Sequence, residues 1–514
     1  MSSSEPVEVE HTTAMALEEK AKLHKSLRRF DMVLFTVCAL VGLDTLGKVS
    51  GYGPQTFAWV VILALTFLLP YALVMAELGT SFPQEGGPYE WMKMAWGRFA
   101  AAVGSVLYWV TNPLWVGGSL AFLSTEIWST NIHNVGSGTI GDYIFKLLFI
   151  WFSITVAIVS LRRGKWIPNA GAIARFVVLG FFSLTVLIFA IKHGVHGYAA
   201  GDFKPTDGAI FLGLTPLLLF NYVGFELQNG AAEEMQNPQH DVPVSIIRSG
   251  LLAAACYIIP VFGILAVLPT SKISGIGGFI DAVNATFSVY GSAGHFLTEC
   301  MAIGAIFALM TSGAVWMMGA DRIQAVAAYD GGAPGFFGKF NAALGTPVRV
   351  NVASGILATA FMIFAQIMLN SGSGSANTFN VVLYLATSTT LLSYLLIFPA
   401  AIKLRRMHPN LHRSYRIPGG DIGLWLSVGI CTVWMALGSW VAIFPGSLEH
   451  LFGYSYNVPD TYGVSWAKFE VFTLGTLAII MVLGVVCYFL GAPVRRRQVD
   501  IPLETVGLEP AAGD

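Results

Sequence analysis

Long runs without a single charged side chain constrain the fold of this chain more than any other feature of its sequence. Residues 49–76, 99–125 and 422–448 contain no Asp, Glu, Lys or Arg, and neither does the longer stretch 350–402. A helix needs about 20 apolar residues to cross a bilayer. Inside lipid, a helix satisfies its backbone hydrogen bonds within itself, which an open chain cannot do. The runs therefore predict helices that span a membrane.

The composition leads to the same fold class. Only 11% of the 514 residues are charged and 55% are hydrophobic, whereas a soluble domain carries about a quarter charged residues. We expect an all-α integral membrane protein with about 12 transmembrane helices. The expected spans cover residues 31–53, 55–78, 99–127, 143–161, 169–191, 209–231, 244–269, 295–320, 349–370, 378–403, 422–445 and 467–490.

The positive charges predict on which side of the membrane each loop lies. An even number of spans places both termini on the same side. Lys and Arg cluster on that side, at residues 20–29, 162–165, 403–416 and 495–497. The loops of the other side carry the lysines Lys192, Lys204, Lys272 and Lys468. Because cytoplasmic loops carry the excess of Lys and Arg, we expect a multi-pass protein of the cell (cytoplasmic) membrane with both termini in the cytoplasm.

Two of the expected spans have polar centres that contain glycine. The first span includes residues 42–48 (GLDTLGK), and the sixth includes residues 221–226 (NYVGFE). An interrupted helix exposes backbone groups at mid-membrane, which lipid tolerates only where they line a cavity or a polar ligand. The alternative is that glycine only allows neighbouring helices to pack closely. The matched positions, five spans apart and each with a carboxylate, favour a transporter with two broken helices.

Loop residues in four places form a pattern that covers most of the chain. They are residues 76–83 (AELGTSFP) with 86–91 (GGPYEW), residues 224–243, residues 329–334 (YDGGAP) with 345–348 (GTPV), and residues 408–420 (HPNLHRSYRIPGG). In this order they resemble the signatures of the amino acid–polyamine–organocation (APC) superfamily of permeases. The resemblance covers roughly residues 30–420, whereas the last two spans match only in number. It implies a leucine-transporter-type fold and secondary transport of amino acids or amines by alternating access.

The same resemblance implies how the chain is divided. The fold it implies has two inverted repeats of five helices each, followed by two peripheral helices. The expected parts are a cytoplasmic N-terminal tail (1–29), the first five-helix repeat (30–204), the second, inverted repeat (205–403), a cytoplasmic loop with helices 11 and 12 (404–490), and a cytoplasmic C-terminal tail (491–514).

The resemblance also places the substrate between the breaks of spans 1 and 6. Many members carry a glycine-rich stretch at the first break, where backbone amides receive the substrate carboxylate. This chain has Asp44 there instead, which is more like the polyamine-uptake branch of the superfamily. The expected substrate-binding residues are Gly42, Asp44, Thr45, Gly47, Phe220, Tyr222, Gly224, Phe225 and Glu226.

Each charged residue at the breaks has more than one interpretation. A carboxylate near the bilayer centre is a functional candidate by default, so Asp44 could bind an ammonium group or carry a proton. Asp44 could instead form an ion pair with Lys48, four residues further on, or cap the outer half-helix. Glu226 could titrate during transport or brace the unwound backbone. The aromatic side chains beside Glu226 could attract a cation or only pack.

Arg175 bears on the coupling ion. In relatives, a lysine near this point of span 5 is thought to replace a sodium ion between spans 1, 5 and 8. Thr311 and Ser312 are the span 8 hydroxyls that would otherwise help to hold that ion. An arginine cannot release its proton, so Arg175 favours proton coupling elsewhere, or exchange, over sodium coupling. The alternative is that Arg175 extends toward the membrane interface.

Several classes of function have no support in the sequence. It contains no phosphate-binding loop and no metal-binding signature, and we identify no catalytic constellation. We therefore expect no enzyme, no cofactor, no metal and no nucleic-acid partner, but a small-molecule substrate, a lipid bilayer and possible proton coupling. The alternatives that stay open are an amino acid permease, a polyamine or cationic amine permease, and a transporter-like nutrient sensor.

Overall fold

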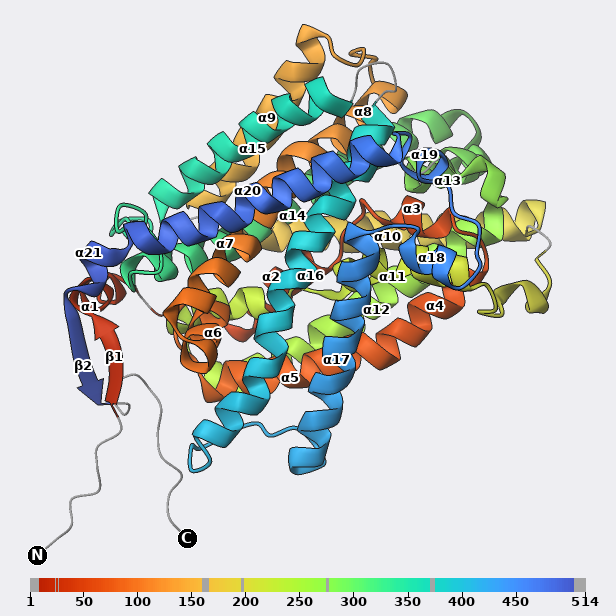
Figure 1. The fold of residues 1–514 in the computed structure, drawn as a ribbon. Helices are drawn as coiled ribbons and strands as arrows, with labels where there is room; N and C mark the ends of the chain where they lie inside the picture. The colour runs from red at the N-terminus through yellow and green to blue at the C-terminus, as the bar shows by residue number, and fades with distance from the viewer. Residues whose placement is uncertain are drawn as a thin grey trace, which may run out of the picture.

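Long apolar helices run through the molecule (Figure 1). The computed structural model describes residues 9–23, 25, 27–159, 166–195, 198–273, 277–369 and 375–502. Within these ranges, 11 helical stretches are long and apolar enough to cross a membrane, and one further span is divided into two shorter helices. The expectation of an all-α membrane protein with about 12 helices is confirmed. The expected basic cluster at residues 162–165 lies outside the described residues.

The spans have the following bounds. Four of them contain a break or a π-helical turn and are therefore made of two or three elements. The interrupted spans are α2 (Arg29–Leu40) with α3 (Leu46–Ser50), α11 (Gly208–Tyr222) with the 3-10 segment η4 (Phe225–Glu234), α4 (Gln55–Leu63) with η1 (Ala64–Leu68) and α5 (Leu69–Ser81), and α7 (Arg98–Trp115) with η2 (Val116–Leu120) and α8 (Ala121–Asn131). The continuous spans are α9 (Ile140–Val159), α10 (Trp166–His193), α12 (Pro238–Val267), α14 (Gly294–Tyr329), α15 (Val348–Leu369), α16 (Ser375–Met407), α17 (Gly420–Ile443) and α20 (Trp466–Leu490).

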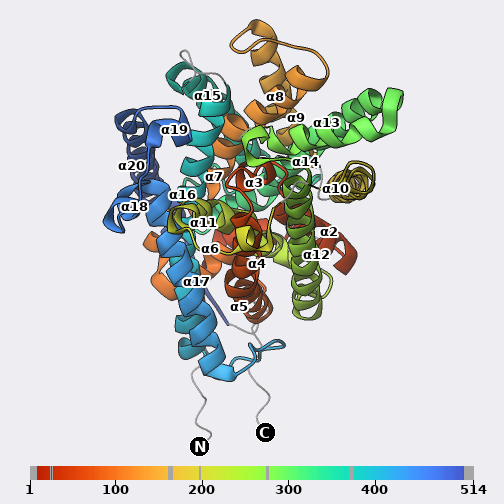
Figure 2. The same ribbon diagram turned by 90° about the vertical axis from the view of Figure 1, so that its right-hand side faces the viewer.

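Short elements cover the two ends of the bundle. The end that holds the first and last described residues, called the termini face, carries β1 (Val9–Thr13), α1 (Ala14–Lys20), α6 (Gly87–Trp96), α21 (Ala492–Arg495) and β2 (Gln498–Pro502) (Figure 1). The opposite face carries η3 (Ala200–Phe203), η5 (Thr270–Lys272), α13 (Gly278–Thr286), η6 (Phe287–Ala293), α18 (Ser447–Leu451) and α19 (Val458–Tyr462), and Figure 2 looks onto it. The antiparallel pairing of β1 with β2 was not expected, because each strand finds its partner at the other end of the chain.

Both expected breaks are present, and a tyrosine from another span supports each of them. Span 1 leaves the helix at Val41, where the backbone N–H of Gly42 donates to the Tyr257 hydroxyl at 2.9 Å and that hydroxyl donates to the Leu40 carbonyl at 2.7 Å. Span 6 breaks at Gly224, whose φ of 135° is a conformation that only glycine adopts without strain. The phenol groups thus replace backbone hydrogen bonds that the breaks remove.

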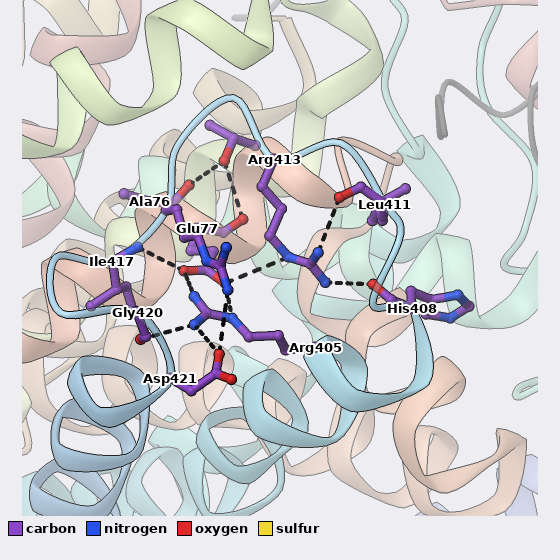
Figure 3. Close-up of polar contacts among 11 residues, drawn as sticks. Ala76, Glu77, Arg405, His408, Leu411, Arg413, Ile417, Gly420 and Asp421 are labelled. Atoms are coloured by element: carbon purple, nitrogen blue, oxygen red, sulfur yellow. Dashed lines mark hydrogen bonds and ion pairs between the residues drawn. The ribbon is translucent and has the colours of Figure 1, made fainter. Parts of the chain in front are cut away.

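Two of the sequence signatures meet at the termini face (Figure 3). Glu77, from the first signature, pairs with the guanidinium of Arg405, whose Nε donates to it at 2.8 Å. The same carboxylate accepts a hydrogen bond from the Ile417 N–H at 2.9 Å and lies 3.7 Å from Arg413. Arg405 also donates to Asp421 at 3.0 Å. These contacts between the two signatures therefore connect α5 to the loop between α16 and α17.

Candidate functional site

The break in span 1 places a carboxylate in the interior. Asp44 is only 2% exposed, and its Oδ2 accepts a hydrogen bond of 3.0 Å from the indole Nε1 of Trp115 on α7. The Trp115 ring packs edge-on against Phe220, with 5.7 Å between the ring centroids. A side chain at residue 42 would bring its Cβ within 2.6 Å of the Asp44 carboxylate, so this approach requires Gly42. Asp44 thus has a neutral donor as its hydrogen-bond partner.

The break in span 6 places a second carboxylate in the interior. Glu226 is fully buried and accepts hydrogen bonds from the hydroxyl of Tyr108, at 2.5 Å, and from the hydroxyl of Tyr71. The Tyr71 hydroxyl also accepts hydrogen bonds from the backbone N–H groups of Gly224 and Phe225, each at 2.9 Å. Glu226 therefore braces the unwound backbone through Tyr71, and its partners are again neutral.

Aromatic rings connect the two carboxylates. The Trp115 ring, which binds Asp44, packs against Trp316 with 6.2 Å between centroids. Trp316 in turn lies 6.4 Å from the ring of Tyr108, which binds Glu226. The indole of Trp316 donates to the Ala39 carbonyl at 3.0 Å, near the end of α2. The two breaks, α7 and α14 thus enclose one interior region with acidic groups at both ends and aromatic faces between them.

Arg175 lies beside the break in span 1. Its side chain is fully buried and does not extend to the membrane interface. The guanidinium donates to the Val41 carbonyl at 2.8 Å, to the Thr311 hydroxyl at 3.1 Å and to the Ala308 carbonyl at 2.5 Å. Ser312 donates to a carbonyl of α2, that of Cys38, at 3.3 Å. A permanent cation therefore occupies the place where spans 1, 5 and 8 meet.

The possible ion pair between Asp44 and Lys48 is not formed in the structure. Within the described chain no ion pair joins these two residues, and the Lys48 ammonium donates instead to the Thr461 carbonyl of α19 at 3.4 Å. The spacing of four brings side chains together only inside a continuous helix, and Asp44 lies before α3 begins. Gly47 serves a packing role, because a Cβ there would lie 2.7 Å from the backbone of Gly278 on α13.

Of the other predicted residues, one is available to a ligand and two have structural roles. Thr45 has a buried hydroxyl without a hydrogen-bond partner among the described residues, so it is available to a ligand at the first break. The Tyr222 hydroxyl donates to the Val60 carbonyl at 2.8 Å. Phe225 packs on the ring of Tyr71, with 5.0 Å between centroids. Tyr222 and Phe225 therefore support the break in the structure.

Sequence reasoning missed the aromatic residues that bind the two carboxylates or the backbone at the first break. They are Tyr71, Tyr108, Trp115, Tyr257 and Trp316. All of them are aromatic side chains within apolar spans, where aromatic residues are common as packing. One signal was available for Trp115, because the glycine pair that follows it lies in the π-helical turn η2, and such turns occur frequently at functional sites.

Comparison with known proteins shows the family. A model of the amino acid permease family matches residues 27–464. A probable agmatine/putrescine antiporter of Lactococcus lactis is 31% identical over 411 residues, which cover 79% of this chain and 84% of that protein. A branched-chain amino acid permease of Bacillus subtilis is 24% identical, over 83% of this chain and 91% of that protein. A glutamate/gamma-aminobutyrate antiporter of Lactococcus lactis is 23% identical, over 71% of this chain and 73% of that protein.

The chain therefore belongs to the amino acid permease family. It is a membrane transporter of amino acids or related amines and not an enzyme. The resemblance to the APC superfamily, expected from the loop signatures, is confirmed.

Proposed function

We propose that this permease exchanges small organic amines, such as diamines or guanidino amines, and that Asp44 receives their cationic group. One observation carries the proposal: within the described chain, Asp44 and Glu226 are buried carboxylates that form no ion pair and accept hydrogen bonds from neutral donors. A carboxylate at mid-membrane is costly without a countercharge. A cationic substrate supplies that countercharge when it binds.

The aromatic faces between the carboxylates suit the same substrate. An ammonium or guanidinium group gains cation–π attraction over the ring of a tryptophan or tyrosine, and Trp115, Trp316 and Tyr108 supply such rings. The relative named as an agmatine/putrescine antiporter supports an amine over a neutral amino acid.

Exchange or proton coupling, rather than sodium coupling, is part of the proposal. The Arg175 guanidinium lies between spans 1, 5 and 8 and binds Val41 and Thr311, where it would repel a sodium ion. We further propose that residues 30–204 and 205–403 are the two inverted repeats, that both termini lie in the cytoplasm, and that the protein is located in the cytoplasmic membrane.

Exchange in proteoliposomes tests the function. Vesicles loaded with unlabelled putrescine should take up external labelled putrescine or agmatine, and empty vesicles should not. Replacing NaCl by KCl should leave the rate unchanged. Asp44→Asn should lower exchange at subsaturating substrate by about 10-fold to 100-fold, the equivalent of one lost charged hydrogen bond.

Asp460→Asn provides a matched control, because among the described residues this exposed carboxylate bonds only its neighbour Asn457, at 2.7 Å. If amino acids but not amines compete, and Asp44→Asn exchanges at the wild-type rate, the amine assignment is incorrect. Binding of amine without any exchange would instead identify a nutrient sensor.

A further inference from the structure

A third buried carboxylate lies on α14, apart from the two at the breaks. Asp321 has no exposed surface. Its Oδ1 accepts hydrogen bonds from the indole Nε1 of Trp109 at 3.0 Å and from the hydroxyl of Ser354 at 2.5 Å. Its Oδ2 accepts one from the side-chain amide of Asn351 at 2.6 Å. These donors come from α7 and α15, and neither helix belongs to the broken spans 1 and 6.

No cation balances Asp321 within the described chain. Burial and the three neutral donors make up its electrostatic surroundings. Charged side chains on the elements packed against this half of α14 bind other partners, among them Arg322 with Glu85 and Glu234, Arg98 with Asp330, Lys93 with Glu90, Lys20 with Glu233, Arg29 with Asp241, Lys146 with Asp142, Glu226 with Tyr108, Arg175 with Val41, and Arg349 with the ring of Phe336. An ionisable residue in a membrane span without a countercharge is a functional candidate.

The hydrogen-bond partners of Asp321 suit its charged form and its neutral form alike. A protonated Oδ2 needs an acceptor where the carboxylate needs a donor. Asn351 can supply either, because its amide carries both kinds of group, and its Oδ1 is buried with no hydrogen-bond partner among the described residues. A larger cation cannot reach the carboxyl group, because Asp321 is fully buried. The ligand that fits this site is therefore a proton.

Polar groups with unmet hydrogen bonds lie between Asp321 and the termini face. Asn351 stands in the first turn of α15, after the loop whose Phe340 N–H donates to Glu19 of α1 at 2.9 Å. Gln324 follows Asp321 by three residues, toward the end of α14 at this face, and its Oε1 is buried without a partner in the described ranges. Buried groups of this kind bind water, and water at these two oxygens would carry protons between Asp321 and the termini face.

We propose that Asp321 is the proton-binding site of the transport cycle, filled from the termini face and separate from the carboxylates that receive the amine. The inference rests on the proposed function. Trp109, which binds Asp321, follows Tyr108, which binds Glu226 at 2.5 Å. The proton and the amine therefore act on adjacent residues of α7. Net movement of amine then requires the proton to leave Asp321, whereas exchange of one amine for another does not.

Transport driven by a pH difference tests the site. In empty wild-type vesicles, a pH difference across the membrane should drive uptake of labelled putrescine beyond that of protein-free vesicles and change the signal of a trapped pH-sensitive dye. Asp321→Asn, which keeps the size of the side chain, should lose both effects and still exchange putrescine in loaded vesicles. Equal pH-driven uptake in the two proteins would overturn the inference, and so would loss of exchange together with pH-driven uptake.

Thr111→Val is the matched control. It removes a buried hydrogen bond of α7, the 2.7 Å contact with the Thr389 hydroxyl of α16, without touching a carboxylate. This variant should keep the pH-driven uptake. If it loses that uptake as Asp321→Asn does, Asp321 only holds the helices together, and the inference is incorrect.

Infrared difference spectra between acidic and neutral pH give a readout that needs no transport. The purified wild type should show the C=O stretching band of a protonated carboxyl group that Asp321→Asn lacks and Glu226→Gln retains. Identical spectra of the wild type and Asp321→Asn would refute the proton site even where amine exchange is normal. The predicted loss of the band in a protein that exchanges no amine would support the proton site and refute the proposed function.

Discussion

Replacing Tyr71 by phenylalanine removes one oxygen atom that serves several groups of the sixth span. The hydroxyl donates to Glu226, accepts hydrogen bonds from the N–H groups of Gly224 and Phe225 at 2.9 Å, and lies 3.3 Å from the Tyr394 hydroxyl. Leaving a buried N–H unpaired costs about 1–3 kcal/mol, and two are affected here. With the bond to Glu226 also lost, we expect Tyr71→Phe to lower the free energy of unfolding by about 4 kcal/mol.

Tyr222→Phe is the matched control for that variant. Tyr222 is also buried, but within the described ranges its hydroxyl makes a single hydrogen bond, to the Val60 carbonyl at 2.8 Å. Loss of one neutral hydrogen bond should cost about 1 kcal/mol. Titration with sodium dodecyl sulfate in mixed micelles, followed by tryptophan fluorescence, compares the two variants with the wild type. If Tyr71→Phe costs no more than Tyr222→Phe, the phenol does not hold the break as we describe.

Three further predictions follow from single contacts. Gly224→Ala should lower the free energy of unfolding by about 1–3 kcal/mol, because the backbone φ of residue 224 is 135°. Gly180→Ala is the control and should not destabilise the protein, because a methyl group there meets nothing within 4 Å. Equal unfolding curves for the two variants would contradict the prediction. Arg322→Met should lower the free energy of unfolding by about 3–5 kcal/mol, because Arg322 forms ion pairs with the buried carboxylates of Glu85, at 2.5 Å, and Glu234. A loss below about 1 kcal/mol would refute the pairing. Burial raises the pKa of Glu449, so the folded protein holds this proton more tightly than the unfolded chain, whose glutamate pKa is about 4.3. The protonated Glu449 therefore adds to the free energy of unfolding at low pH, and this contribution is lost as the pH rises through the folded-state pKa. The melting temperature of Glu449→Gln should consequently fall less with rising pH than that of the wild type. An equal fall in the two proteins would show that Glu449 does not cause the pH dependence.

The sequence predicted the spans and the two breaks because their signals are local. In lipid, an apolar run is stable as a helix. Such a run is visibly interrupted by Asp44 and its flanking glycines in the first span, and by Gly224 and Glu226 in the sixth. The contacts across the breaks could not be predicted, because they depend on which helices lie side by side. Nothing in its own neighbourhood distinguishes Tyr71 from a packing aromatic. Lys48 is the opposite case. Its spacing of four from Asp44 suggested an ion pair, but the helix is broken between the two residues and their side chains do not pair.

The distribution of charge across the molecule has a consequence for how substrates pass. Among the described residues, the ion pairs that join different segments, including those of Arg322 and Arg405, lie near the termini face. On the opposite face the contacts over span 1 are neutral acceptors and backbone, such as the Thr461 carbonyl that receives Lys48. In the middle, Asp44 and Glu226 are compensated by neither face. Under the proposed function, a cation that moves inward would pass from water to these two carboxylates, and it would leave at the termini face only when the ion pairs there separate and water solvates them.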